Sequence, residues 1–446
     1  MLSSEYLEKE RKKYAIYVLQ NRALPSIADG MKIACRRLLW TARNGQKYKT
    51  AALSGATMPL HPHAAADGVV NTNTGEFLNN IPLFEGIGAF GSRLAPNSAA
   101  SPRYTSVKVS KFTQDVVFKD IELIEMIDNY DQTLKEPKNY FPLVPTVLLN
   151  QSDGIGVGFA STILPRSLLD IIKSQIQYLN GKRITPVLPE FTPIRSKAIE
   201  KIIENDTPKY IFKSSFIRLN SFEIHVTELQ YGTTYDKFIN TLNKLEESGF
   251  IKDYIDSSSE KIDIIVKFPR GYLNKVDDEI VLKKIGLISR VSENLTVLDF
   301  QGDKVITPDY ETIIRDFCDY RVKIYDARYR RLLGLLQADI QKYKDIILAI
   351  EKKVGLQSVK MADRNELKEF LKKIGIVNLD YIADLSVYRF TIKEKEKVEL
   401  KLKDALVQEA EYLDILADDT KQVAIYVSEL KEILSNYKKG KYGSIN

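Results

Sequence analysis

The chain has 446 residues, of which 44% are hydrophobic and 28% charged. This composition is ordinary for a globular protein, and the length predicts two to four domains. No apolar run approaches the roughly 18 residues of a membrane span, and the charged N-terminus does not resemble a signal peptide, so no membrane association is expected. The chain has two cysteines far apart, Cys35 and Cys318, and three histidines. A reducing cytoplasm is therefore expected, without a disulfide framework or a His/Cys zinc site.

Basic charge is concentrated near the N-terminus. Residues 1–111 contain 15 Lys or Arg and 7 Asp or Glu, whereas the remaining residues sum to a charge of about −2. Between Arg11 and Lys49 there are ten basic residues and one acid, Asp29. Such a basic segment is typical of a polyanion partner, usually nucleic acid. A solvated helix face is the alternative explanation of the charge alone.

The first 60 residues predict short helices joined by tight turns. An amphipathic helix is expected over 5–20, a break at 23–25, and a second helix that Asp29 and Gly30 open and that ends at 44–45. Another short helix is expected over 48–56. Short helices with a basic surface fit a helix-turn-helix or winged-helix module.

A glycine-rich segment follows, and it does not predict a cofactor loop. Residues 86–91 match G-x-G-x-x-G, but a dinucleotide fingerprint needs a strand before it and a helix after it, whereas Pro82 precedes this segment and Pro96 follows. The sequence contains no P-loop and no Asp-x-Asp pair. ATP hydrolysis by a P-loop and a paired-carboxylate magnesium site of that form are therefore not expected.

The loop at 99–105 places Arg103 directly before Tyr104, ahead of a predicted strand at 107–109. A phenol has a pKa near 10, so little of it is ionised at neutral pH. A neighbouring cation stabilises both the phenolate and the charge that develops on an attacked phosphate. Taken alone, however, this dipeptide is common, and an ordinary surface position is the alternative.

The rest of the chain predicts an α+β region followed by long helices. Residues 141–165 alternate apolar strand with glycine turns, and 166–307 mix helices with strands expected at 261–268 and 295–300. After Pro308 the chain is helical, with an apolar stripe at coiled-coil spacing over 317–350. A second charged helix is expected over 391–408, paired antiparallel with the first and carrying a small domain at about 355–390, and helices continue to 438.

Several motifs occur in one order that resembles a known family. They are YAIYVLQNRALPSIADGMKIACRRLLW at 14–40, His61-Pro62-His63, GIGAFGS at 86–92, Arg103-Tyr104-Thr105, Asp128-Asn129-Tyr130-Asp131, and VPTVLLNQSDGIGVGFASTILP at 144–165. The order is similar to that of the cleavage subunit of type IIA DNA topoisomerases, the family that contains the A subunits of gyrase and topoisomerase IV. Within that family the likeness is greatest to members from T-even-type bacteriophages. The likeness is strong over 14–165, clear in order to about 350, and architectural beyond.

The resemblance implies a multidomain α+β fold. A winged-helix DNA-binding and cleavage domain that holds the catalytic tyrosine is expected over 1–165. An α/β tower domain is expected over 166–307. A long antiparallel coiled coil with a small helical dimerisation domain is expected over 308–440.

The resemblance also implies roles for individual residues. Tyr104 would attack a DNA phosphate and hold the 5′ end covalently, while Arg103 and Arg22 would stabilise the transition state. Ile155 would wedge between base pairs and bend the DNA. The positions that would grip the DNA backbone near the cut are Lys32, Arg36, Arg37, His61 and His63.

The implied partners are double-stranded DNA, a second copy of this chain, and a partner subunit that binds ATP and Mg²⁺, with no metal bound by this chain itself. The expected location is the cytoplasm, that of a bacterial host if the chain is phage-encoded. No C-terminal DNA-wrapping domain is expected within these 446 residues, which favours relaxation or decatenation over supercoiling. Two departures from the family pattern, at 33–35 and 64–66, remove a histidine and leave drug sensitivity open.

Two other classes compete with this interpretation. A non-catalytic architectural protein with the same surface would bind DNA with a steep salt dependence but form no covalent adduct. A tyrosine recombinase would need an Arg-His-Arg set near a C-terminal tyrosine, and both the position of Tyr104 and the few histidines disfavour it.

Overall fold

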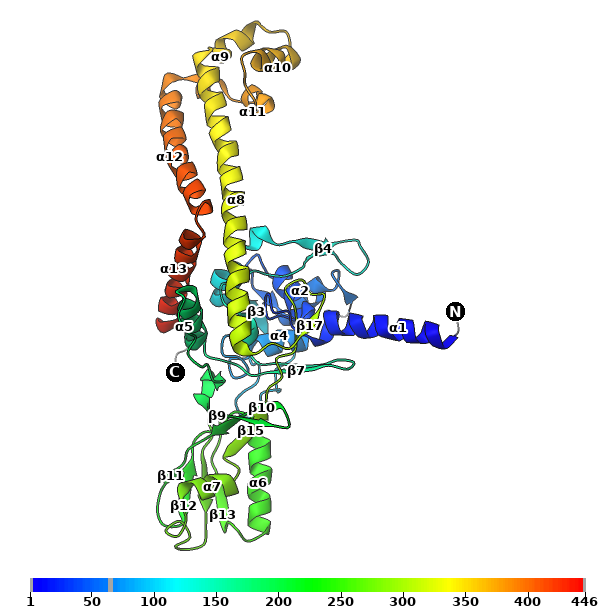
Figure 1. Ribbon diagram of the computed structural model, residues 1–446, viewed down its shortest axis with the longest axis vertical. Coiled ribbons are helices and arrows are strands. Elements are labelled where there is room, and N and C mark those ends of the chain that lie inside the picture. The colour runs from blue at the N-terminus through cyan, green and yellow to red at the C-terminus, as the bar shows by residue number, and fades with distance from the viewer. Residues whose placement is uncertain (1–2, 63–66, 444–446) are drawn as a thin grey trace. The chain divides into compact units, whose positions relative to one another are not determined.

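The computed structural model describes residues 3–62 and 67–443. The chain forms two compact units, one made of 1–321 and 427–446 and the other of 322–426. Figure 1 labels many of the helices and strands of both units. No helix in the described ranges is both long and apolar enough to cross a membrane.

The N-terminal part of the first unit consists of helices around a small sheet. α1 (Ser3–Val18) runs directly into η1 (Leu19–Ala23), one turn of π-helix. The helices that follow are α2 (Ile33–Thr41), α3 (Thr50–Thr57) and α4 (Asp67–Thr74). The sheet has the order β1-β3-β2 and is antiparallel, with β1 (Tyr48–Lys49), β2 (Phe84–Ile87) and β3 (Ser106–Val109).

Two local predictions in this part are wrong. The helix expected to open at Asp29 and Gly30 and to end at 44–45 runs only from Ile33 to Thr41. The helix expected over 48–56 begins only at Thr50, because Tyr48 and Lys49 pair with Val107 and Ser106 as a strand. By contrast, the described residues between β2 and β3 form no helix. The glycine-rich segment therefore lacks the helix that a dinucleotide fingerprint requires, as the sequence indicated.

Short elements then lead to α5. They are η3 (Thr113–Val117), η4 (Ile121–Leu123), the hairpin of β4 (Met126–Asp128) and β5 (Lys135–Pro137), and η5 (Thr146–Leu148). A second hairpin pairs β6 (Ser152–Ile155) with β7 (Ala160–Ile163), and α5 (Leu168–Leu179) follows it. A turn of 3-10 helix, η6 (Thr192–Ile194), comes later.

Residues 190–292 contain two four-stranded antiparallel sheets. The first has the order β15-β10-β9-β8 and is formed by β8 (Glu190–Phe191), β9 (Ser196–Glu204), β10 (Thr207–Lys213) and β15 (Ile288–Ser292). The second has the order β11-β12-β14-β13 and is formed by β11 (Ile217–Arg218), β12 (Glu223–Val226), β13 (Asp253–Asp256) and β14 (Ile264–Lys267).

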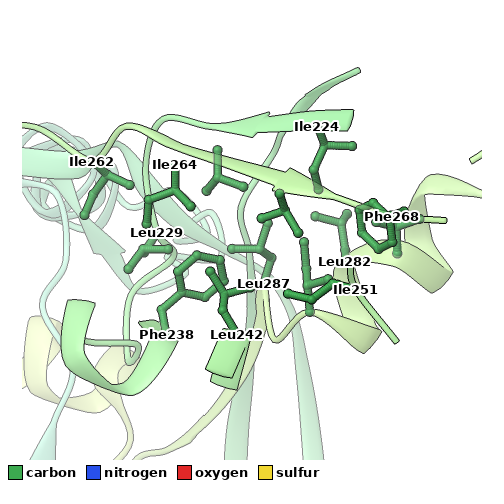
Figure 2. Close-up of a cluster of buried hydrophobic side chains, with 14 of the residues drawn as sticks. Ile224, Leu229, Phe238, Leu242, Ile251, Ile262, Ile264, Phe268, Leu282 and Leu287 are labelled. Carbon is green, nitrogen blue, oxygen red and sulfur yellow. The ribbon is translucent and has the colours of Figure 1, made fainter. Parts of the chain in front are cut away.

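The second sheet has its own hydrophobic core. α6 (Tyr235–Glu247) and α7 (Asp278–Lys284) pack Phe238 and Leu282 against Ile224 and Ile264 of the sheet (Figure 2). The strand predicted over 295–300 is shorter than expected. Only Val297–Leu298 (β16) is a strand, paired with Val305–Ile306 (β17).

The second unit contains two antiparallel helices. α8 (Tyr310–Glu351) begins in the first unit, and α12 (Ile392–Leu416) lies beside its later turns. Tyr329 contacts Tyr412 at 5.5 Å between ring centroids, and Glu351 pairs with Lys395 at 2.9 Å, so the two helices run in opposite directions. The residues of the predicted apolar stripe are buried or half-buried, except Ala327, which is exposed.

Small helices lie between α8 and α12. They are α9 (Val354–Gln357), η7 (Ser358–Lys360), α10 (Arg364–Lys373), α11 (Leu379–Ala383) and η8 (Val387–Phe390). A core that includes Leu371, Ile376 and Val398 joins them to the long helices. α13 (Asp419–Lys438) follows α12. The predicted mixture of helices and open sheets is confirmed, whereas the names winged helix, tower and dimerisation domain, with their boundaries, stay predictions.

Candidate DNA-cleavage site

Tyr104 lies in an exposed loop between β2 and β3. Its side chain is 73% exposed, and the guanidinium carbon of Arg103 lies 6.0 Å from the centre of its ring. A cation at this distance from an aromatic face is attracted to it, and both groups face solvent. The phenol is therefore accessible to a large ligand, with a positive charge beside it.

The backbone around Tyr104 is held by the first turn of α3. The N–H groups of Thr50 and Ala51 donate to the carbonyls of Thr105 and Pro102, at 3.1 and 3.2 Å. The Thr50 and Thr105 hydroxyls also bond to each other at 2.7 Å in a buried position. These contacts satisfy N–H groups that a helix N-terminus leaves without partners inside the helix. They hold the loop rigidly while the phenol stays exposed.

Arg22 occupies a different surface. It lies in η1, where its side chain is exposed while Leu19 and Ala23 in the same turn are buried. A π-helical turn inserted at the end of an α-helix is a frequent feature of functional sites. Here it points an arginine to solvent at the edge of a cleft of about 980 Å³, whose lining also includes Tyr17, Lys32 and His61.

Lys32 and His61 are held by contacts within the cleft. The Lys32 ammonium donates to the carbonyl of Asp153 at 2.5 Å, and its burial lowers its pKa, which the charge of Asp153 partly offsets. His61 is buried and lies 3.1 Å from the Tyr17 hydroxyl, with its ring 5.0 Å from that of Tyr130. Both residues line this cleft.

Arg36 and Arg37 require a correction. Both were predicted to grip DNA, but both are buried. Arg36 donates to both carboxylate oxygens of Asp29 at 2.7 and 2.9 Å, and Arg37 to both of Glu136 at 2.5 and 2.8 Å. A bidentate pair of this kind occupies two N–H donors of the guanidinium, so these donors are not available to a phosphate. Arg36 therefore belongs to the interior of the first unit, and Arg37, although it lines the same cleft as Arg22 and Lys32, has its guanidinium held by Glu136.

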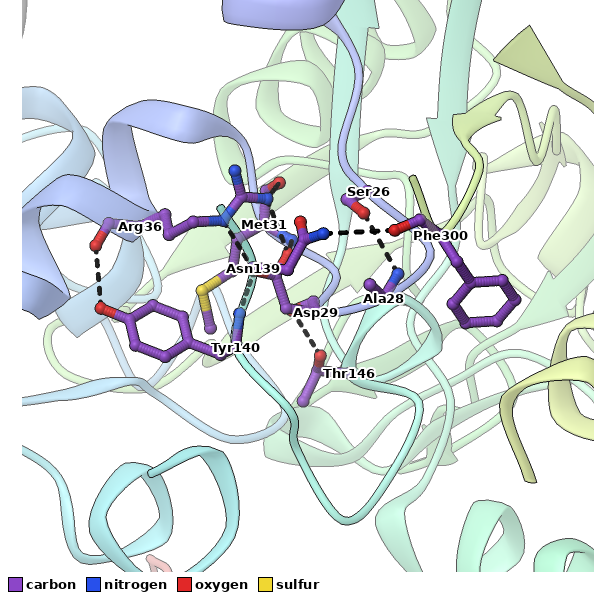
Figure 3. A network of polar contacts seen from close by, with 9 residues as sticks. All are labelled: Ser26, Ala28, Asp29, Met31, Arg36, Asn139, Tyr140, Thr146 and Phe300. Carbon is purple, nitrogen blue, oxygen red and sulfur yellow. Dashed lines mark hydrogen bonds and ion pairs between the residues drawn. The ribbon is translucent and has the colours of Figure 1, made fainter. Parts of the chain in front are cut away.

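Asp29 is the centre of the network that holds Arg36 (Figure 3). Its carboxylate accepts from the N–H of Met31 at 3.1 Å and of Tyr140 at 3.0 Å, and its carbonyl accepts from the Thr146 hydroxyl at 2.6 Å. Burial by itself lowers the pKa of Arg36, but the charge and hydrogen bonds of Asp29 outweigh it, so the pKa is raised. The network ties the start of α2 to the segment around 140–146.

Ile155 lies at the tip of the β6–β7 hairpin and is 88% exposed. Val157 and Phe159, in the same tip, are 49% and 45% exposed. An isoleucine this exposed buries little of its surface in the folded chain, and a cluster of exposed apolar side chains at a tip is typical of an interaction surface. This exposure fits the predicted wedge.

Sequence reasoning missed several residues near these sites. Lys49 approaches the Tyr104 carbonyl at 3.5 Å and is exposed, but it was seen only as part of a basic segment. Val157 and Phe159 could have been found from the pattern G-I-G-V-G-F, in which each apolar residue stands beside a glycine. His63, predicted to contact DNA, lies outside the described residues.

The predicted residues therefore fall on three surfaces rather than one. Arg103 and Tyr104 share a loop, Arg22 and Lys32 line the cleft, and Ile155 is at the hairpin tip. In the ranges 3–62 and 67–443, no group of three or more His, Cys, Asp or Glu is placed to hold a metal ion. These surfaces combine a cleft lined by Arg22 and Lys32, an exposed tyrosine beside an arginine, and an apolar tip, and a nucleic-acid-binding surface with a candidate nucleophile has such features.

The comparisons with known proteins place the chain in a family. The family of the DNA gyrase and topoisomerase IV A subunits matches residues 22–431, so the chain belongs to that family. The chain is 30% identical to the DNA topoisomerase medium subunit of Enterobacteria phage T4, over 96% of this chain and 97% of that protein. It is 27% identical to DNA topoisomerase 2 of Crithidia fasciculata over 90% of this chain, but it spans only 33% of that protein. The predicted family is confirmed.

Proposed function

We propose that the chain is the DNA breakage–reunion subunit of an ATP-dependent type II DNA topoisomerase. The observation that carries the proposal is the exposed Tyr104, which α3 holds beside Arg103. Family membership and the resemblance to a phage topoisomerase subunit support the same assignment.

In the proposed reaction the Tyr104 oxygen attacks a backbone phosphorus of DNA. The bond from phosphorus to the 3′ oxygen breaks, the leaving 3′ oxygen takes up a proton, and the tyrosine gives one up. The 5′ end is then joined to the tyrosine as a phosphodiester. Because that bond keeps the energy of the broken one, the free 3′ hydroxyl can reseal the strand by the reverse reaction.

Arg103 and Arg22 would stabilise the added negative charge on the phosphorus oxygens. Guanidinium groups bind phosphate oxygens with charge-assisted, often bidentate bonds. Lys32, His61 and His63 are proposed to hold the DNA backbone near the cut, and Ile155 to enter the base stack. Lys49 is added to this set because it is exposed next to Tyr104.

Mg²⁺ and ATP are proposed to come with a partner subunit. No group of ligating side chains suited to a metal is present in the described ranges, so no step is assigned here to a metal held by this chain. The role left to this chain is to position the nucleophile, the arginines and the DNA.

A homodimer is also part of the proposal, because cutting both strands requires two tyrosines. An exposed apolar patch at one end of the second unit offers a surface for a second copy. The patch is formed by Leu356, Val359, Val387, Tyr388 and Ile392, each 58–83% exposed. Gly355 lies against Phe390, which brings α9 and η8 together within this patch. Exposed apolar patches of this kind mark protein interfaces in soluble chains.

A covalent-trapping assay tests the proposed function. The chain is combined with the partner subunit from the same source, Mg²⁺, ATP and end-labelled duplex DNA, and the reaction is stopped with detergent. DNA linked to protein, with its 5′ ends resistant to a 5′ exonuclease and its 3′ ends sensitive to a 3′ exonuclease, is the expected result.

Two variants sharpen the assay. Tyr104→Phe should abolish the adduct, while Tyr381→Phe, which removes a hydroxyl from another exposed tyrosine, should leave it unchanged. An adduct that survives Tyr104→Phe would exclude Tyr104 as the nucleophile. Salt-sensitive DNA binding by the native chain with no adduct would instead favour the architectural alternative.

A further inference from the structure

Two glycines of the β6–β7 hairpin pack directly on η1. A Cβ atom at Gly154 would lie 2.0 Å from the carbonyl oxygen of Ala23, and one at Gly156 would lie 2.5 Å from Cδ2 of Leu19 and 3.2 Å from Cβ of Ala23. Real Cβ contacts are essentially never closer than 3.0 Å. Only glycine lets the hairpin backbone sit this close to the helical turn.

These glycines stand on one side of the strand and Ile155 on the other. Successive side chains of a strand point to opposite faces, so residues 154 and 156 share the face that meets η1. Ile155, between them, is directed to solvent. The packing of the two glycines therefore fixes the direction in which Ile155 points.

The turn that receives the glycines is the one that carries Arg22. Leu19 and Ala23, which the glycines contact, lie three residues before and one residue after Arg22. This turn is itself fastened, because the side-chain amide of Gln20 donates to the Gly302 carbonyl at 3.1 Å. A shift of the hairpin therefore acts on the backbone next to Arg22.

Lys32 makes a second link between the hairpin and the cleft. Its ammonium donates to the carbonyl of Asp153, the residue before Gly154, at 2.5 Å. A Cβ at Gly154 would also lie only 3.6 Å from the Lys32 nitrogen. The hairpin, η1 and the start of α2 thus meet around Gly154.

We propose that Gly154 and Gly156 are positioning residues that join the β6–β7 hairpin and η1 into one rigid body, so that insertion of Ile155 between base pairs places Arg22 at the phosphate to be cut. The bend in the DNA then becomes a condition for cleavage, because Arg22 reaches its position only when the hairpin is seated in the duplex. This inference rests on the proposed function.

A double-mutant cycle on cleavage tests this link. Gly154→Ala meets a backbone oxygen, so the hairpin must move, and misplacing a catalytic group by about 1 Å lowers a rate on the order of 100-fold. The rate of adduct formation at saturating DNA should fall by that factor, while the DNA concentration for half-saturation changes by less than about threefold. If Gly154→Ala acts through Arg22, combining it with Arg22→Ala should lower the rate no further than Arg22→Ala alone. If the rate reductions of the two single variants multiply in the double variant, the inference is overturned.

A second pair of substitutions with a smaller steric effect keeps the test decisive if Gly154→Ala fails to fold. Gly156→Ala meets mainly the end of the Leu19 side chain, and Leu19→Val removes that Cδ2 atom. Gly156→Ala should slow cleavage, and Gly156→Ala with Leu19→Val should recover most of the rate, with thermal unfolding as the check on folding. No recovery in a folded double variant counts against the proposal.

A distance measurement separates failure of this inference from failure of the proposed function. Spin labels at Val157→Cys and Asn21→Cys report on the hairpin and η1 in the free chain. A narrow distance distribution that broadens with Gly154→Ala supports the rigid body, even if the native chain forms no adduct, in which case the proposed function alone fails. A broad distribution in the native sequence refutes the inference whether or not DNA is cut.

Discussion

Replacing Ile155 with alanine removes the proposed wedge without touching the core. The side chain is 88% exposed, so its loss should change the free energy of unfolding by no more than about 0.5 kcal/mol. If the side chain becomes buried between base pairs, the substitution removes three carbon atoms from that contact. At about 0.8 kcal/mol for each buried carbon, the bent complex loses about 2.4 kcal/mol.

This loss should appear in the bending equilibrium. Because 1.4 kcal/mol corresponds to a factor of ten, about 2.4 kcal/mol lowers the ratio of bent to straight complex roughly 50-fold. A short duplex with donor and acceptor dyes at its ends reports this ratio as energy transfer in the presence of the protein. The rate of covalent adduct formation should fall by a similar factor, since cleavage is proposed to need the bend.

The matched control is Ile203→Ala, which removes the same atoms from an isoleucine of β9 that is 63% exposed. It should leave bending and cleavage unchanged. The reasoning is refuted if Ile155→Ala changes the bending ratio by less than about threefold, or if Ile203→Ala has the same effect.

Three further predictions concern stability, reactivity and assembly. Asp29→Asn leaves the buried Arg36 without its charge partner, so chemical denaturation should show a loss of about 3–5 kcal/mol, and a loss below 1 kcal/mol would contradict the role given to this pair. Burial and the charge of Asp29 raise the pKa of Cys35 to about 12, so roughly one Cys35 thiol in ten thousand is ionised at pH 8. Maleimide should therefore label Cys35 only when the chain unfolds, and mass spectrometry would measure the labelling. Val359→Glu puts a charge in the apolar patch of the second unit and should shift the chain from dimer to monomer in light scattering, whereas Ile203→Glu should not; a dimer that survives the first change would exclude this patch as the interface.

Local sequence signals were sufficient for the elements that depend on neighbours in the chain. The break after Ala23 and the long helix after Pro308 follow from turn residues and periodicity, which act over a few positions. The failure at Tyr48 and Lys49 has the opposite cause. Those residues pair with a strand more than 50 positions later in the chain, and this pairing overrode their local preference for a helix.

For the candidate site, the sequence determined which chemistry is available and the tertiary structure decided which residues can use it. The Arg103-Tyr104 pair and the glycine-flanked Ile155 are legible in the sequence because both depend on adjacent residues, and both prove exposed. Arg36 and Arg37 look equally fit to bind DNA in the sequence.

Only the folded chain shows that Arg37 meets Glu136, 99 positions away, and that Gly154 seats against Ala23. An arginine binds whichever anion lies closest, and its burial is set by segments that are distant in sequence. The sequence therefore shows that an arginine is charged and that a glycine is small. The fold decides which anion pairs with the arginine and which backbone contact the glycine permits.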